Sequence, residues 1–540
     1  MSKLWATSWT ERIKLEKHII KAMKVYFNSQ KSKIYNILFF VSLFFICFYF
    51  DFFTILKADF QSQHVWRQTD SASQALNYYQ RNMNFFQPEV HNLIDGDSHT
   101  LAEFPITYYL SAILMQFFGP QNWTIRIVNL AFFLIGVFYF FKLNHKICDN
   151  FLLALFSSFC LFCCPVVVFY ASSSVPNSAA LGMIFVAGWF FYCFQDTQKI
   201  NFLWKSMLFF SIAGMIKPTL LVTYFALLGV WMYDVLHKKQ EDRAVFMRPI
   251  SQLIPLSLVI FCLLIWRIYV YWYVTKHHSE IFFLSHVMPI WDMNSDDIAD
   301  TCDWMKNFWV KISFGRLLMQ FFLGVFIAAI FSFRRFPKWL YAFWLLTLLG
   351  SIGIACLFFQ QFSIHDYYAI DFYPLFAVAL MALAAVFSIL KNNVTKNLII
   401  IFLGFILFQN ILHSKADLSD RYNYVKPYDH EKNSSFFKQK ELQLFLDSLH
   451  IDKKDFVVSI PDFSPNTNLY FLNRKGLTNY NFFYIKLEAD KISDVLQKNN
   501  CKYLIVSNIN SQIVKPFAYL MTDDKLRGVF DNSIYVYQLF

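Results

Sequence analysis

The sequence has few charged residues for its length and almost none inside its long apolar runs. Charged residues make up 16% of the 540 positions, whereas 56% are hydrophobic and 20% are aromatic. The chain contains no glycine-rich phosphate loop, no nucleotide-binding fingerprint and no internal repeat. Most of the ten cysteines lie inside apolar runs, where cysteine is typical of core packing. The composition therefore excludes an ordinary soluble protein.

The apolar residues form blocks of about 20, the length that a helix needs to cross roughly 30 Å of hydrocarbon. The blocks at 34–53, 151–170 and 253–274 are typical. They are too long and too numerous for a single signal peptide. The sequence therefore predicts a polytopic α-helical membrane protein.

The positive charges predict the orientation of the chain. The net charge is +11, but lysine and arginine are concentrated in short segments between the apolar runs, so they act as orientation signals and not as a nucleic-acid-binding surface. The lysine-rich residues 1–33 are predicted to be a cytoplasmic basic segment. Eleven spans, which put the C-terminus outside, are expected near 34–56, 124–142, 151–172, 178–195, 203–216, 218–236, 250–273, 314–333, 339–358, 372–390 and 396–412.

The chain divides into a transmembrane domain, 34–415, and a small α/β domain, 416–540, on the extracytoplasmic side. The first outward loop, 57–123, is long. Within it, the apolar stretch 104–119 is predicted to lie along the outer interface, because counting it as a span would move basic loops outside. After residue 415 the composition becomes polar, with helix patterns at 434–451 and 490–500 and strand patterns at 455–462, 502–508 and 533–539.

Several ionisable residues fall at the predicted outer membrane surface, where such groups are costly and often functional. A site that handles a lipid phosphate needs cations to hold the anionic leaving group and a carboxylate to take a proton from the attacking hydroxyl. Asp70 is the candidate for the carboxylate. The candidate cations are Arg67, Lys217 and His365.

Each of these residues also has a structural interpretation. Arg67 could reach lipid headgroups or pair locally with Asp70. Lys217 could mark an outward helix end, although the charge rule disfavours lysine there. His365 and Asp366 lie among tyrosines and could belong to an aromatic belt. Asp70 could cap the helix that follows it, which is compatible with catalysis.

The first loop resembles a known family. Asp70 is followed by "SASQALNYYQRNMNFFQPEVHNLIDG", then "EFPITYYLSAILMQFFG", then "PQNWTIR". This order is similar to that of the GT-C glycosyltransferases that use polyprenyl-phosphate sugars, which include the protein O-mannosyltransferases and the bacterial aminoarabinose transferases of lipid A. "HVWRQTDSAS" resembles a bacterial subgroup, and "GMIKPTLL" and "HDYYAIDFYP" resemble later outward motifs. The resemblance covers about residues 34–390.

The resemblance implies roles for particular residues. It implies Asp70 as the catalytic base and Glu103 as a carboxylate that shapes the site or orients the acceptor. It implies Lys217 and His365 as candidate contacts to the lipid phosphate.

The chain departs from the family at two positions. Phe104 stands where the lipid A transferases tend to have lysine, and Asn177 stands where several members have an aspartate. Asn177 could orient an acceptor or cap the fourth span. Asp366 and Tyr367 are further candidates for orienting the acceptor or the sugar.

The predicted function is a membrane glycosyltransferase of the bacterial cytoplasmic membrane. It would move a sugar from a polyprenyl-phosphate carrier, undecaprenyl phosphate in this reading, to an acceptor outside, with inversion. No cofactor is required, although a divalent metal could be held by Asp70, Glu103, His365 and Asp366. The alternatives are a flippase of a lipid-linked sugar, which would favour repeats and charges at the bilayer midplane, and a polysaccharide polymerase or ligase with diphosphate-linked donors.

Overall fold

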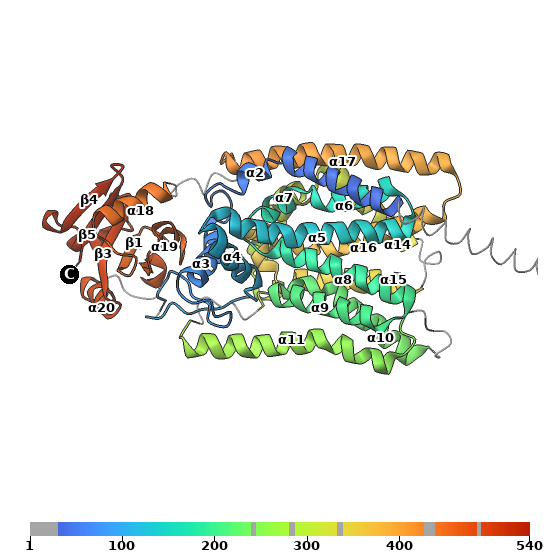
Figure 1. The fold of residues 1–540 in the computed structure, drawn as a ribbon, viewed down its shortest axis with the longest axis horizontal. Helices are drawn as coiled ribbons and strands as arrows, with labels where there is room; N and C mark the ends of the chain where they lie inside the picture. Colours follow the sequence, from blue (N-terminus) through green and yellow to red (C-terminus); the bar gives the residue numbers. More distant parts are fainter. Residues whose placement is uncertain are drawn as a thin grey trace, which may run out of the picture.

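A bundle of long helices carries a small mixed α/β domain at one end (Figure 1). The computed structural model describes residues 31–94, 96–238, 243, 245–279, 287–331, 338–425, 438–482 and 488–539. The predicted fold class, a polytopic helical protein with a C-terminal α/β domain, is confirmed. Most of the basic segment 1–33 lies outside the described residues.

Each of the eleven predicted spans coincides with a helix or a bent helix pair. Within the described residues, eight helices are long and apolar enough to cross a membrane, or up to ten if each of two bent pairs is one span. The helix at the predicted fifth span, α9, is apolar but shorter. The eight segments are Lys31–Tyr49, α5 (Asn122–Cys148), α8 (Asn177–Thr197), η1 with α10 (Pro218–Leu221, Val222–His237), α11 (Pro249–Lys276), α15 (Lys338–Leu357), η7 with α16 (Asp366–Phe372, Tyr373–Ile389) and α17 (Asn393–Tyr422).

Two of the expected spans are bent at a break. The first pair bends by 76° just before a proline, which cannot donate the backbone hydrogen bond that would continue the helix. The second pair bends by 101°. The helices of these pairs, with α9, are α6 (Phe151–Phe162), α7 (Pro165–Ala171), α9 (Ile200–Ile216), α12 (Ser295–Trp304), η5 (Met305–Trp309), α13 (Val310–Ser313) and α14 (Arg316–Phe331).

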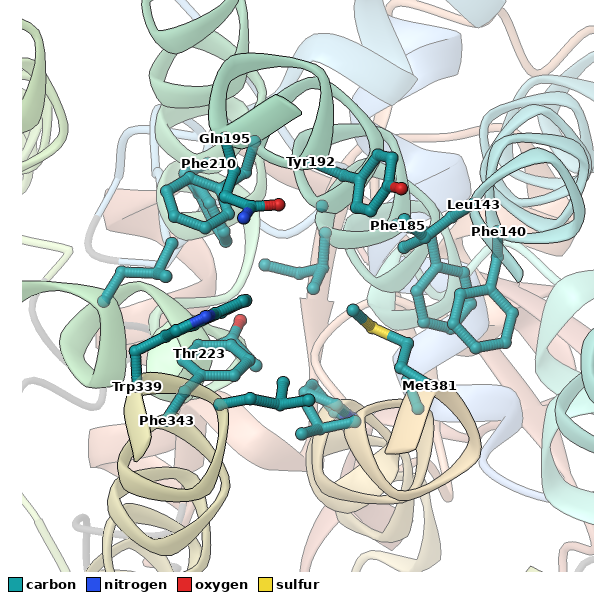
Figure 2. A pocket seen from close by; sticks show the side chains of 18 residues that line it. Phe140, Leu143, Phe185, Tyr192, Gln195, Phe210, Thr223, Trp339, Phe343 and Met381 are labelled. Carbon is teal, nitrogen blue, oxygen red and sulfur yellow. The ribbon is translucent and has the colours of Figure 1, made fainter. Parts of the chain in front are cut away.

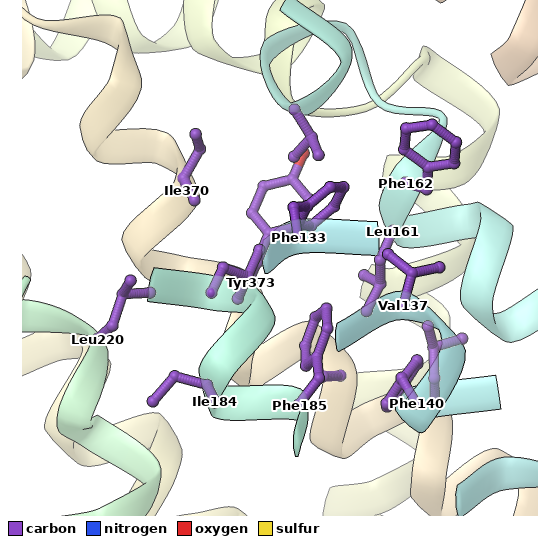
Figure 3. Close-up of a cluster of buried hydrophobic side chains, with 14 of the residues drawn as sticks. Phe133, Val137, Phe140, Leu161, Phe162, Ile184, Phe185, Leu220, Ile370 and Tyr373 are labelled. Atoms are coloured by element: carbon purple, nitrogen blue, oxygen red, sulfur yellow. The ribbon is translucent and has the colours of Figure 1, made fainter. Parts of the chain in front are cut away.

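The centre of the bundle core is formed where α5, α6 and α8 meet. Figure 3 shows phenylalanines of α5 packed against Phe162 of α6 and Phe185 of α8. Helices α5 and α8 come close together at two glycines. A Cβ atom built on Gly136 would lie 2.3 Å from the Cα of Gly182. Small residues at such a crossing let the two backbones approach, which is how helices associate inside membranes.

Gly182→Ala is expected to destabilise the bundle by roughly 1–3 kcal/mol, the usual range for overpacking. Its Cβ would lie 2.3 Å from the carbonyl oxygen of Phe132, a backbone atom that cannot rotate away. Thermal unfolding of the detergent-solubilised protein measures the effect. Gly188→Ala on the same helix is the control, because its Cβ would meet only a leucine methyl at 3.9 Å. Equal melting temperatures for the two variants would contradict the close crossing.

The first loop folds over the end of the bundle and contains two helices. The segment that leads into the loop is held by Arg126 of α5. This side chain is fully buried and donates hydrogen bonds to the carbonyl oxygens of Ile55 and Ala58, each at 2.5 Å. Arg126 therefore anchors the chain and is unavailable to a ligand. The predicted interfacial stretch 104–119 contains a helix that packs against its neighbours in the loop and the bundle. The loop helices are α3 (Val65–Gln80) and α4 (Ile106–Phe118), and the short α2 (Phe52–Ile55) precedes the loop.

The C-terminal domain is built on a five-stranded sheet with the order β2-β1-β3-β5-β4. Strands β2, β1 and β3 are parallel, and β5 and β4 are antiparallel to their neighbours. The five predicted elements are all present, whereas α19, β2 and β4 were not predicted. The elements are α18 (Gln439–Ser448), β1 (Phe456–Ile460), α19 (Thr467–Leu472), β2 (Gly476–Thr478), α20 (Ala489–Lys498), β3 (Cys501–Ser507), β4 (Leu526–Phe530) and β5 (Ile534–Gln538).

The first loop is hydrogen-bonded to the edge of this sheet. Leu93 donates its backbone N–H to the carbonyl oxygen of Gly476 at 2.8 Å, and Gly476 donates to the carbonyl oxygen of His91 at 3.0 Å. The loop thus pairs with β2 and covers an edge that would otherwise be unpaired. Helix α17 also continues to Tyr422, beyond the predicted boundary at 415. The C-terminal domain is therefore fastened to the loop that carries the candidate site.

Candidate active site

Helix α3 carries two of the predicted site residues, Arg67 and Asp70, one turn apart. The helix begins at Val65, after His64 in the left-handed conformation with φ of 55°. Its first turn is held by Gln68, whose side chain donates to the carbonyl oxygen of Gln63 at 2.9 Å. Asp70 therefore lies in the second turn, and the interpretation of Asp70 as a helix cap is wrong.

Asp70 accepts a hydrogen bond from the C-terminal domain. The side-chain amide of Asn466 donates to Asp70 Oδ1 at 2.8 Å. The amide oxygen of Asn466 in turn accepts from the backbone N–H groups of His91 at 3.1 Å and Asn92 at 3.0 Å. Both the nitrogen and the oxygen of the Asn466 amide are thereby engaged, so the orientation of Asp70 depends on the first loop and on the C-terminal domain.

Burial raises the pKa of Asp70 to about 6, although the charge of Arg67 and the hydrogen bond from Asn466 act in the opposite direction. A carboxylate with a pKa near 6 is ionised at neutral pH and is a stronger base than an exposed aspartate. Asp462, which follows β1 and also acts on Asp70, has its pKa raised by burial to about 6. Asp70 thus has the properties that a general base requires.

Arg67 forms an ion pair with Glu103, and this pair is the centre of a hydrogen-bond network. Tyr108 donates its hydroxyl to the same Glu103 oxygen, and Ser71 donates to the Tyr108 hydroxyl at 3.1 Å. Arg67 also donates to Ser71 Oγ at 3.2 Å. The Arg67 side chain is 24% exposed, so the guanidinium is held in place while still accessible to a ligand. Arg67 pairs with Glu103 and not with Asp70, which corrects the local-pairing interpretation.

Lys217 follows the end of α9 and lies close to Arg67 and Glu103. The backbone N–H of Phe104 donates to the carbonyl oxygen of Met215 at 3.2 Å, which brings the two segments together. Lys217 Nζ lies 3.7 Å from the buried carboxylate of Asp371 and 3.9 Å from the ring centre of Tyr368. Lys217 is therefore held by an ion pair and a cation–π contact.

His365 lies beside the same cations. Burial, followed by the nearby His64 and Lys217, lowers the pKa of His365 to about 3. The ring is therefore neutral at neutral pH, so it is a hydrogen-bonding group and not the cation that we predicted. Its Nδ1 atom is buried and has no hydrogen-bond partner among the described residues. Arg67, Asp70, Glu103, Lys217 and His365 together are called the α3 site below.

Asp366 belongs to a buried ion cluster beneath the α3 site. Its Oδ2 lies 2.9 Å from Arg421 of α17, and its Oδ1 lies 3.2 Å from His64 and accepts from Tyr170. Arg421 also donates to Asp417 at 2.9 Å. The Asp366 side chain is 1% exposed. The arrangement positions His64 and the start of η7, and it leaves Asp366 little access to a substrate.

Asn177 and Tyr367 also lie in the interior. Asn177 is the first residue of α8, and its amide donates to the carbonyl oxygen of Tyr367 at 3.5 Å. The Tyr367 ring lies 5.1 Å from that of His365, centre to centre, and stacks on it. Phe104, the departure from the lipid A transferases, packs against Trp266 at 4.9 Å and supplies no charge. These residues support the walls of the α3 site.

Two apolar cavities lie among the helices. One, of about 70 Å³, is lined by α5, α8, α9, α10, α15 and α16 and is almost entirely apolar (Figure 2). The larger one, of about 490 Å³, lies between α10 and α15. Its lining includes Pro218 and Thr219, which directly follow Lys217, and Phe358. The wall of the larger cavity therefore begins at the residue that follows Lys217 in the chain.

The four residues named as a metal-ligand set do not form such a set. Glu103 is paired with Arg67, and Asp366 is paired with Arg421. In the part of the chain that the structure describes, the group with metal-ligand spacing is a different one, Asp97 with two histidines.

Several residues around the α3 site were not predicted. Asn466 reaches Asp70, and Arg421 reaches the ion cluster around Asp366, each from a segment that is distant in the sequence. Tyr108 and Thr219 resemble ordinary interfacial or loop residues. Asp371 carried a usable signal, because it is a charge inside an apolar stretch, and it accepts from Thr219 at 2.6 Å.

Comparison with known proteins supports this description. Residues 99–267 match a family model described as dolichyl-phosphate-mannose-protein mannosyltransferase. The fold is similar to that of ArnT from Cupriavidus metallidurans bound to undecaprenyl phosphate, with a TM-score of 0.59 and 10% identity over 93% of this chain and 98% of that chain. For ArnT in the apo state, the TM-score is 0.61 at 10% identity over 93% of this chain and 97% of that chain. No curated protein matches the chain in sequence.

The helices and the fold define a class, the multi-pass membrane proteins whose fold is similar to that of ArnT. The fold that the resemblance of the first loop implied is confirmed, and part of the first loop lies within the matched segment. The family model covers the segment from His99 to Arg267, and the similarity of fold extends over nearly the whole chain.

Proposed function

We propose that the protein transfers a sugar from a polyprenyl-phosphate carrier to the hydroxyl group of an acceptor on the extracytoplasmic side of a bacterial cytoplasmic membrane. One observation carries the proposal. A carboxylate with a raised pKa, Asp70, is held close to two cations, Arg67 and Lys217, and the residues that directly follow Lys217 line an apolar cavity. This combination suits a substrate with an apolar chain and an anionic head.

The donor is a lipid monophosphate sugar, undecaprenyl phosphate being the expected carrier. The cavity between α10 and α15 offers an apolar wall for the polyprenyl chain. Lys217 precedes the first residue of that wall and can meet the phosphate by charge. The bound undecaprenyl phosphate of the similar ArnT structure supports this choice of carrier.

Transfer is a single in-line displacement with inversion at the anomeric carbon. The acceptor oxygen forms a bond to the anomeric carbon while the bond from that carbon to the phosphate oxygen breaks. Asp70 takes the proton of the acceptor hydroxyl, and the electron pair of the broken bond remains on the phosphate. Arg67 and Lys217 stabilise the charge that develops there. His365 is a neutral ring, and its buried Nδ1 atom supplies a hydrogen bond.

Glu103 acts by positioning. Its carboxylate holds the guanidinium of Arg67, and the Tyr108 hydroxyl holds the carboxylate. Three further residues support the site without touching the sugar or the acceptor. They are Asn177, Asp366 and Tyr367, and this role differs from the direct orientation of the acceptor or sugar that we predicted for them. The scheme needs no metal, because fixed cations take the charge.

The two rival functions make different demands. A flippase needs polar groups along a path through the bundle. Helix α3, which carries Arg67 and Asp70, lies instead at the end of the bundle beside the C-terminal domain (Figure 1). A polymerase or ligase would use a diphosphate-linked donor. The match to a family named for a monophosphate donor favours the monophosphate.

The test is transfer by the purified protein in lipid nanodiscs. A panel of radiolabelled sugars is offered on undecaprenyl monophosphate and, separately, on undecaprenyl diphosphate, with membrane extract as acceptor. We expect sugar incorporation and release of undecaprenyl phosphate from a monophosphate donor. Transfer from diphosphate donors alone would favour the polymerase or ligase. Movement of the intact donor across proteoliposomes without transfer would favour the flippase.

Lys217→Gln is expected to weaken use of the donor, raising KM for the lipid phosphate sugar by about 10-fold or more, because one charge-assisted contact of roughly 1.5–3 kcal/mol is lost. Lys238→Gln is the matched control. Lys238 pairs with the buried Asp234 at 2.8 Å, as Lys217 pairs with Asp371, but it lies at the far end of α10. If both variants keep the wild-type KM, Lys217 does not contact the phosphate.

A further inference from the structure

Asp97, His99 and His277 form a cluster that the glycosyl transfer does not use. The two imidazole rings stack with centres 4.6 Å apart and an interplanar angle of 24°. The Nδ1 atom of each ring faces the Asp97 carboxylate, His99 at Oδ1 and His277 at Oδ2. One potential ligand atom from each of the three residues lies within 4.8 Å of the others. Three donors of this kind converge on one small volume.

The position of Glu89 shows how His99 is oriented. The second ring nitrogen of His99, Nε2, lies 3.6 Å from Glu89 Oε1. Glu89 is itself paired with Lys475 of the C-terminal domain, which is nearly buried. A histidine that binds a metal through one nitrogen usually gives the other N–H to a carboxylate, and this outer contact orients the ring. The Glu89–His99 contact has that form.

A bound cation also resolves a conflict in the hydrogen bonding of His99. Both nitrogens of this ring face carboxylates, and a neutral imidazole carries a proton on only one of them. If Nδ1 binds a cation, the single proton stays on Nε2 and is donated to Glu89. The two Nδ1 atoms and the Asp97 oxygen are then all lone-pair donors to the same ion.

We propose that Asp97, His99 and His277 bind a divalent zinc ion. Two imidazoles and one carboxylate are a set that zinc accepts, with the fourth position left for water. The three side chains are partly exposed, at 37%, 29% and 16%, so an ion can enter from solvent. The ion joins the first loop to the end of α11 and, through Glu89 and Lys475, to the C-terminal domain. The zinc ion therefore stabilises the position of the first loop, which carries Asp70.

The test measures zinc binding directly and does not depend on sugar transfer. The full-length protein in detergent is stripped with a chelator, given zinc chloride and passed through a desalting column. Bound zinc is then measured by mass spectrometry, and the melting temperature is compared with that of the stripped protein. We expect about one zinc per chain and a higher melting temperature. Zinc-edge X-ray absorption is expected to show two imidazole ligands.

His277→Asn and His278→Asn are the matched pair. His278 is the next residue and is exposed, and its left-handed backbone with φ of 51° tolerates asparagine. We expect His277→Asn to bind zinc at least about 10-fold more weakly, whereas His278→Asn binds as the wild type does. If His277→Asn does not fold, Asp97→Asn takes its place. A wild type that retains no zinc, or equal retention by both histidine variants, would overturn the proposal.

Discussion

Asp70→Asn is expected to lower the rate of sugar transfer by roughly 10²–10⁴-fold, the usual contribution of a general base. Asparagine has nearly the same shape as aspartate but cannot take a proton. Turnover of the donor by the variant and the wild type, with melting temperatures of both, measures the effect. Asp59→Asn in the same loop is the control, since Asp59 accepts a comparable hydrogen bond from Asn122 at 2.9 Å. If the folded Asp70→Asn variant transfers sugar at the wild-type rate, another group is the base.

The pH dependence of sugar transfer is a second test of Asp70 as the base. The pKa of Asp70 is raised to about 6 by burial, and the ionised carboxylate is the active form. Activity is therefore expected to fall as the pH decreases through about 6 and to level off above it. The hydrogen bond from Asn466 lowers this pKa because it favours the charged form. Asn466→Ala should then move the acid limb to higher pH, an effect that mere loosening of the domain would not produce.

Arg421→Met is expected to destabilise the protein by roughly 3–5 kcal/mol, because it leaves two buried carboxylates without their cation. Arg421 is fully buried and lies 2.9 Å from both Asp366 and Asp417. Thermal or denaturant unfolding in detergent checks the size of the effect. Adding Asp366→Asn to Arg421→Met should recover part of the loss, since one of the unpaired charges is then removed.

Arg527→Met is the control for this substitution. Arg527 is exposed on β4, where such a change is usually within about 0.5 kcal/mol. If Arg421→Met unfolds under the same conditions as Arg527→Met, the cluster around Asp366 contributes little to stability. In that case the role of Asp366 would have to be sought in substrate binding after all.

The helices of the bundle were predictable because a span leaves a long, continuous signal. The intervals expected at 124–142 and 178–195 correspond to α5 and α8, with differences at their ends. The start of α3 was misplaced by six residues. Its first turn, from Val65, depends on the conformation of His64 and on a side-chain contact from Gln68, which have no pattern in the sequence.

The site was predictable only in part. Arg67, Asp70 and Glu103 are recognisable because they interrupt an apolar, aromatic segment with charge. The ion pair between Arg67 and Glu103 was not predictable, since Arg67 could have paired with Asp70 instead. The protonation of His365 was also misjudged, because the sequence shows a histidine but not the burial and the neighbouring charges that keep it neutral.

The sequence by itself determined that the chain crosses a membrane many times, that a small α/β domain follows, and which charged residues need an explanation. These properties depend on local composition and periodicity, which a sequence displays directly. The tertiary structure decided which groups meet. Asn466 reaches Asp70 from 396 positions away, and Arg421 of the last bundle helix meets Asp366 in the interior. Such contacts are set by how the helices and the sheet pack, because the energy of a buried charge depends on partners that only folding brings near.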